Sequence, residues 1–256
     1  MMFDIVIPVG PNDINFINKT LELNKINIIN YRNIYIITNL LLIKDKSIFN
    51  DCILIDENIF PFNSNTIKIY LGDNDKNKNN WYLQQLIKLY ASFVIPNMLD
   101  NYLVVDSDTV FLKPTTFFEK NIPLYNFGTE YHIQYFNHMR NLHPLFSKVN
   151  NMSGICHHII FQKYVLIHLF KIVENFHNNN KQFHNNKQFY QIFLESVEKN
   201  DILHSGASEY EIYFNFIQTY YPNKYKIRKL KYKDVSNIIL NKDEDYVSCH
   251  WYMRNI

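Results

Sequence analysis

The sequence predicts an α/β protein in which helices flank a mainly parallel sheet within a single domain. Short apolar runs alternate with helical patterns through the first half of the chain, which is the order that parallel sheets produce. The chain has 256 residues, of which 47% are hydrophobic, enough for one substantial core. Polar and turn residues follow the apolar runs directly. The chemistry is therefore expected just beyond the strand ends, where such sheets bind ligands.

Four buried strands and two long helices are predicted in the first half. Asp13 is placed to cap a helix that runs to about residue 29, because Asp is a common N-cap residue. Apolar side chains recur at helical spacing over residues 81–94, and Pro96 ends that helix. The runs expected to form strands are 3–9, 33–38, 52–55 and 102–105.

The second half is less regular. The segments expected to be ordered are a strand at 124–127, helices at 164–176 and 208–220, a late strand at 226–230 and a strand-like run at 246–251. A near-duplication at about 177–189, HNNNKQF followed by HNNKQF, is typical of a low-complexity surface insertion. It contributes His177 and His184, and a solvated loop is favoured there over a metal site.

Composition and charge exclude several classes of protein. The formal net charge of +2 is far from the basic footprint of a nucleic-acid binder. Three widely spaced cysteines, Cys52, Cys156 and Cys249, form no paired framework and favour a reducing compartment. The start of the chain lacks the pattern of a signal peptide, and the apolar stretch at 34–43 is too short for a transmembrane segment. We expect a cytoplasmic protein, in a host cytoplasm if the gene is viral.

The most informative segment delivers two carboxylates at the end of a predicted strand. Asp106 and Asp108 follow the apolar run 102–105, with Ser107 between them. An extended chain would place both carboxylates on one face, and a bent one would aim them at different targets. Hard oxygen ligands of this kind suit Mg²⁺ or Mn²⁺ holding a diphosphate. The structural alternative is that both acids only form the turn after the strand.

Two reactions use such a pair. In one, the acids hold a metal on a nucleotide sugar; in the other, Asp106 is the nucleophile of a haloacid-dehalogenase-like phosphatase and Asp108 its acid/base. A phosphatase of that class carries the motif on its first strand, whereas about three strands precede it here. The position therefore favours the transferase. A non-catalytic sugar-binding protein is a third, weaker alternative, because the acid pair is intact.

Seven segments resemble a group of predicted GT-A glycosyltransferases of bacteria and large DNA viruses. They begin at Phe60, Trp81, Val104, Gly128, Ser153, Ser205 and Asp245, and read FPF, WYLQQLIKLYA, VVDSDTVF, GTEYH, SGICHH, SGASEYEIYFNF and DYVSCHW. The resemblance covers nearly the whole chain. It implies a GT-A fold whose residues 1–115 bind a nucleotide-diphosphate sugar and whose residues 116–256 bind the acceptor, a glycan, lipid or protein. It does not imply which sugar or which acceptor.

The resemblance also implies roles for residues of the donor half. Pro8 and Val9 lie where the base and ribose of the donor would bind. Gln85 and Lys88 share a helix face, from which Lys88 would offset phosphate charge, although a solvated face explains them equally. Asp106 and Asp108 would hold the metal, Asp108 would also act in catalysis, and Ser107 would bind the donor.

In the acceptor half the resemblance adds a late metal ligand and a catalytic carboxylate. His250 would complete the metal site, and an imidazole among carboxylates suits Mn²⁺ better than Mg²⁺. Ser208 and Glu211 fit a capping box, which leaves Glu209 to deprotonate the acceptor or to hold the donor sugar. We also expect Glu130, with His132, and one of two adjacent histidines, His157 in preference to His158, to line the pocket.

Overall fold

A computed structural model describes residues 1–72, 76–179, 186–238 and 243–254 of the chain. Its centre is a five-stranded sheet with the strand order β3-β2-β1-β4-β8. β1, β2, β3 and β4 are parallel, and β8 pairs antiparallel with β4. The five strands are β1 Phe3–Pro8, β2 Tyr31–Thr38, β3 Ile53–Asp56, β4 Asn101–Val105 and β8 His158–Gln162. The predicted class, a mainly parallel α/β sheet flanked by helices, is confirmed.

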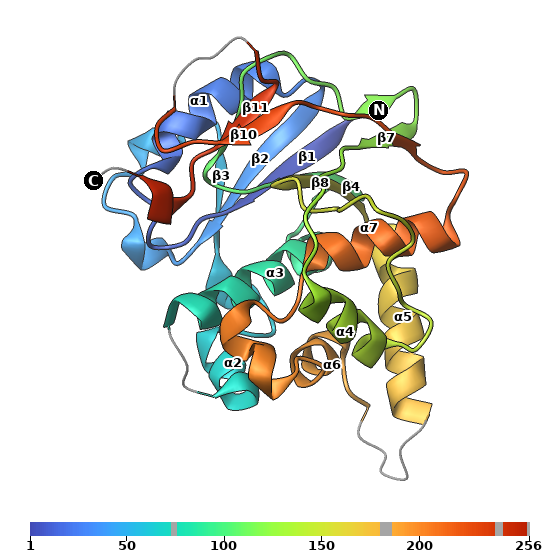
Figure 1. The fold of residues 1–256 in the computed structure, drawn as a ribbon. Coiled ribbons are helices and arrows are strands. Elements are labelled where there is room, and N and C mark those ends of the chain that lie inside the picture. Colours follow the sequence, from blue (N-terminus) through green and yellow to red (C-terminus); the bar gives the residue numbers. More distant parts are fainter. Residues whose placement is uncertain (73–75, 180–185, 239–242, 255–256) are drawn as a thin grey trace.

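Helices lie on both sides of this sheet (Figure 1). In the view of Figure 1, α2 to α7 gather below the sheet, and α1 lies above it beside the small strands β10 and β11. The helices are α1 Ile17–Asn27, α2 Ser64–Leu71, α3 Lys76–Val94, α4 Ile133–Leu142, α5 Lys163–Asn179, α6 Phe189–Glu195 and α7 Glu209–Tyr220. One hydrophobic cluster includes side chains from both halves of the chain, so the two halves share a core.

A second sheet brings three distant segments to one place. It has the order β10-β11-β5, in which β10 Tyr232–Asp234 and β11 Tyr246–Ser248 are parallel and β5 Thr109–Phe111 is antiparallel to β11. β5 therefore begins at the edge where β10 and β11 end. Asp108, Asp234 and His250 meet there, although they are far apart in the sequence. The third sheet consists of β6 Phe118–Glu119, β7 Ile122–Tyr125 and β9 Lys226–Ile227.

The predicted start of the first helix is wrong. α1 begins at Ile17, and its N-cap is Phe16, which forms no side-chain cap. Residues 11–16 form turns instead, and the Asp13 side chain bonds to Ser107 and Arg254. These long-range contacts use the carboxylate that a cap would need. Propensity alone did not reveal them, because both partners are far away in the sequence.

Other boundaries shift by a few residues. α3 and α5 are longer than predicted, and the strand-like run near the C-terminus ends at Ser248, before a short 3₁₀ helix Trp251–Met253. Part of the low-complexity segment, with His184, lies outside the described residues, whereas His177 bonds to carbonyls of α4. A bilayer-crossing helix is not found in the part of the chain that the structure describes.

Candidate active site

A cavity of about 780 Å³ opens beyond the carboxyl ends of β1 and β4, where α3 and α7 contribute to its wall. Two lysines, Lys78 and Lys88, line it together with six carboxylates. The carboxylates belong to Asp13, Asp106, Asp108, Glu130, Glu209 and Asp234. The carboxylates outnumber the cationic side chains even when His157 and His250, which also line the cavity, are protonated. This balance disfavours an anionic ligand such as a diphosphate unless cations accompany it.

Side chains of α1 fix the segment that carries the two predicted acids. Thr20 donates to the carbonyl of Ser107. The buried Asn24 side chain donates to the carbonyl of Thr109 and accepts from the amide of Phe111. The segment therefore bends after β4 under the control of α1, and Asp106 and Asp108 face different partners.

Asp106 lies in a buried ionic network. Lys88 Nζ is 2.7 Å from Asp106 Oδ1 and 2.7 Å from Glu209 Oε1. The Tyr210 hydroxyl also donates to Asp106 Oδ1, at 2.7 Å. Burial favours the protonated form of Asp106, but Lys88 and His157 outweigh burial and hold its pKa well below the usual range. Asp106 is therefore an anion in this environment.

Lys88 occupies the position expected of it, but its charge is already matched. Burial alone would lower the pKa of the ammonium group, and Asp106 and Glu209 instead raise it above its ordinary value. Gln85, on the same helix face, accepts a hydrogen bond from the Glu209 amide. Both side chains are buried, so the alternative of a solvated helix face is wrong.

Glu209 lines the cavity but is tied to its wall. Burial raises the pKa of its carboxyl group, against the opposing effect of Lys88. Ser208 caps α7 by accepting from the Glu211 amide, as predicted. The reciprocal half of the capping box is absent, because the Glu211 carboxylate bonds to Ser153 and Asn215 instead.

Asp108 faces the C-terminal segment. Its Oδ2 atom is 2.9 Å from His250 Nδ1. Its Oδ1 atom is buried and has no hydrogen-bond partner among the described residues. A buried carboxylate oxygen is costly when unpaired, so this atom is available to a cation or a donor group of a ligand.

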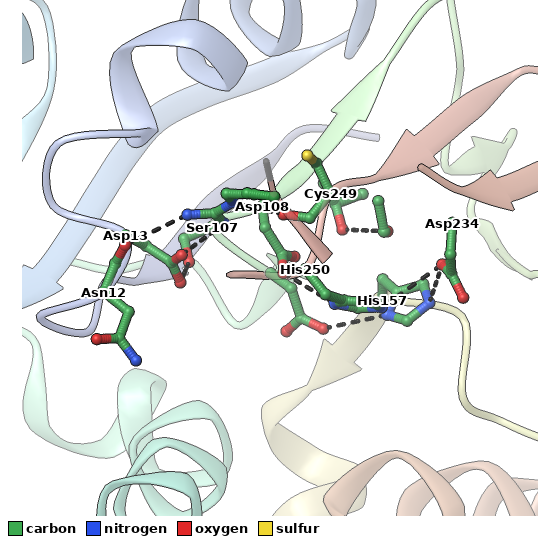
Figure 2. Close-up of polar contacts among 12 residues, drawn as sticks. Asn12, Asp13, Ser107, Asp108, His157, Asp234, Cys249 and His250 are labelled. Atoms are coloured by element: carbon green, nitrogen blue, oxygen red, sulfur yellow. Dashed lines mark hydrogen bonds and ion pairs between the residues drawn. The ribbon is translucent and has the colours of Figure 1, made fainter. Parts of the chain in front are cut away.

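His157 and His250 approach each other across the carboxylate of Asp234 (Figure 2). The Nε2 atom of each ring lies 3.5 Å from Asp234 Oδ1. Burial opposes protonation of both rings. The neighbouring carboxylates nevertheless raise the pKa of His157 to about 9 and that of His250 to about 11. In the absence of a cation, both imidazoles are thus held in their charged form.

The adjacent histidines have different surroundings, as expected. His157 lines the cavity, whereas the ring of His158 is buried against Phe111, Phe117 and Tyr246. Burial lowers the pKa of His158 to about 3. His158 is therefore a neutral residue of the core.

The remaining predicted residues lie around the same region. Pro8, Ser107 and Glu130 line the large cavity, and Glu130 Oε2 lies 3.2 Å from His132 Nε2. Val9 does not line it. Val9 belongs instead to a second cavity of about 180 Å³ beyond β1 and β2, whose lining shares Pro8 and Gln84 with the large one.

Several residues of the cavity were not predicted. Asp234 stands alone in a lysine-rich stretch, and only the pairing of β10 with β11 brings it to His250. Tyr210 was hidden within a helical pattern. Both tryptophans of the chain, Trp81 and Trp251, line the cavity, although neither carries a spacing signal. Asp13 was visible in the sequence but was assigned to a helix cap.

Comparison with known proteins identifies the family. Residues 36–247 match a family of unknown function, DUF6492, and the chain belongs to this family. No curated protein matches the sequence. Among solved structures, the chain is similar to the crystal structure of mouse xyloside xylosyltransferase 1 in its apo form. The TM-score is 0.46, the sequence identity is 7%, and 97% of each chain is covered.

Proposed function

We propose that this protein is a metal-dependent glycosyltransferase of the GT-A type, which transfers a sugar from a nucleotide-diphosphate donor to an acceptor. The observation that carries the proposal is the acid pair Asp106 and Asp108 at the end of β4, within a cavity lined by six carboxylates. The cavity volume of about 780 Å³ is in the range of small-molecule sites. The anionic lining makes binding of a diphosphate depend on a cation.

The donor is proposed to bind between the two cavities. Pro8 and Val9 would contact its base and ribose from the end of β1, and Ser107 and the acid pair would lie near its diphosphate. The bound cation would stabilise the charge that develops on the departing diphosphate. The expected metal ligands are Asp106, Asp108 and His250, which form the first candidate set. A set of ligands that includes an imidazole favours Mn²⁺ over Mg²⁺.

The acceptor is proposed to enter from the second half of the chain. Residues 116–256 supply Glu130, His157 and Glu209 to the wall of the cavity. Burial raises the pKa of Glu209, which strengthens it as a proton acceptor for an acceptor hydroxyl. Lys88 would hold that carboxylate in place. The acceptor itself would be a glycan, lipid or protein, and the reaction would take place in the cytoplasm.

A screen for ligand-induced thermal stabilisation tests this function. The protein is melted with nucleoside diphosphates and their sugars, each with and without Mn²⁺. A ligand that binds only the folded state increases the free energy of unfolding, by about 2.7 kcal/mol at a hundredfold excess over Kd, and so raises the melting temperature. We expect one nucleotide family to stabilise the protein only when Mn²⁺ is present. No stabilisation by any of them, together with phosphate release from a simple ester, would instead indicate a phosphatase with Asp106 as nucleophile.

A further inference from the structure

We infer that the cation is held by His157 Nε2, Asp234 Oδ1 and His250 Nε2. Asp106 and Asp108 lie behind these ligands and orient the two rings. The inference deepens the proposed function, because it concerns the cation of the same cavity. It can nevertheless be tested without any sugar transfer, since it makes a statement about metal binding alone.

The spacing of the three atoms matches a shared ion better than mutual hydrogen bonds. Each imidazole Nε2 lies 3.5 Å from Asp234 Oδ1, beyond the usual range of N–H···O hydrogen bonds. All three ligand atoms lie within 4.8 Å of one another. Two atoms bound at roughly 2.1 Å to a tetrahedral ion are about 3.4 Å apart. The two separations from Asp234 Oδ1 therefore fit ligands around a common centre.

The opposite nitrogen of each ring faces a carboxylate of the predicted acid pair. His250 Nδ1 lies 2.9 Å from Asp108 Oδ2, and His157 Nδ1 lies 3.6 Å from Asp106 Oδ2. Metal-binding histidines commonly donate their second N–H to a carboxylate, which fixes the tautomer and the direction of the ring. Asp108 thus holds the His250 ring by a hydrogen bond, whereas Asp106 lies at ion-pair distance from His157 Nδ1. With these neighbours on the Nδ1 side, both Nε2 atoms lie 3.5 Å from Asp234 Oδ1.

The conformation of His157 supports a ligand role independently. Its φ of 59° lies in the left-handed region, which residues with a side chain adopt at a cost and which is frequent at functional sites. The residue is only 7% exposed, yet its Nε2 atom has no hydrogen-bond partner among the described residues. A buried nitrogen without a partner, at the centre of a polar cluster, is available to an ion.

The chemical types of the three metal ligands also indicate which ions would bind. Two imidazoles and one carboxylate suit Mn²⁺, Fe²⁺ and Zn²⁺, whereas Mg²⁺ prefers oxygen ligands throughout. Three protein ligands leave coordination positions open for ligand oxygens. The side chain of Asp234 is 41% exposed, so the ion would sit where the donor can reach it.

Pulsed electron paramagnetic resonance of bound Mn²⁺ distinguishes the two possible ligand sets. The full chain is stripped with a chelator, loaded with Mn²⁺, and examined for ¹⁴N coupling. We expect two coupled imidazoles, reduced to one in His157→Gln. A single coupled imidazole in the wild type, lost in His250→Gln and unchanged in His157→Gln, would overturn the inference in favour of Asp106, Asp108 and His250.

Affinities for Mn²⁺ give a second measurement that does not depend on spectroscopy. Asp234 is the last residue of the edge strand β10, so the variant Asp234→Asn should fold normally, as its melting temperature would verify. We expect it to weaken Mn²⁺ binding more than a hundredfold, and Asp108→Asn roughly ten- to a hundredfold, the range seen when a supporting carboxylate is lost. Glu130→Gln, which removes a charge from the same cavity, should change it less than about threefold. Equal affinities in Asp234→Asn and Glu130→Gln would contradict the inference.

Discussion

Lys88 illustrates how a single side chain can have the expected place and a different set of contacts. A cation on the helix face before the acid pair was expected to meet phosphate. In the structure its Nζ is shared between Asp106 and Glu209, and the side chain is buried. Its charge therefore balances two carboxylates of the protein before any ligand arrives. Its main effect should be on the positions of Asp106 and Glu209, and thus on folding stability.

Replacing Lys88 tests this at the scale of one residue. Lys88→Met leaves the buried Glu209 carboxylate without its cation and removes one of two cations beside the partly buried Asp106. The loss of one partner from a buried ion pair costs about 3 to 5 kcal/mol. We expect a loss of about 3 kcal/mol in the free energy of unfolding, measured by urea denaturation. Lys78→Met is a matched control, because Lys78 lines the same cavity but donates to the neutral Ser205 hydroxyl. The control should lose about 1 kcal/mol. Equal losses in both variants would indicate that Lys88 is free to bind an anion.

At the scale of elements, pairing between strands creates the part of the site that residue patterns did not reveal. Asp106, Asp108, Glu209, His157 and His250 were recognised because each stands in a segment with a motif. Asp234 has no such setting, and the parallel register of β10 and β11 alone places it beside His250. The bonds of α1 to the segment 107–111 were likewise invisible, since they join side chains to backbone atoms distant in the sequence.

The contact between α4 and α6 predicts an acid-sensitive stability. His138 on α4 bonds through Nε2 to the carbonyl of Phe193 on α6, at 2.8 Å, and is 1% exposed. Burial lowers its pKa to about 4, against an ordinary value of 6.5. Between these values the unfolded chain binds a proton that the folded chain does not. The contribution of neutral His138 to the free energy of unfolding is therefore complete above pH 6.5 and is lost as the pH falls towards 4.

Comparison with His138→Gln isolates this effect, because glutamine can also donate to the Phe193 carbonyl. From pH 6 to pH 5, we expect wild type to lose about 1 kcal/mol more unfolding free energy than the variant. Denaturant unfolding at a series of pH values measures the difference. Parallel curves for the two proteins would show that His138 titrates equally in the folded and unfolded states.

At the scale of the whole molecule, the periodicity of the sequence was sufficient for the sheet and most helices. Buried runs such as 102–105 and the apolar spacing of 81–94 leave few other ways to form a core. The helix start at Asp13 failed because tertiary contacts took its carboxylate. The charge of the cavity could not be predicted without the fold. Its six carboxylates come from five separate parts of the chain, and their sum is apparent only when the sheet has assembled them.

Metal-dependent sugar transfer is measured as the release of nucleoside diphosphate from a panel of nucleotide sugars by chelator-stripped protein. We expect release from one nucleotide sugar only after Mn²⁺ is restored, and a decrease of roughly a hundredfold in the rate of Asp108→Asn. Undiminished release in excess chelator, or an unchanged rate in Asp108→Asn, would contradict it.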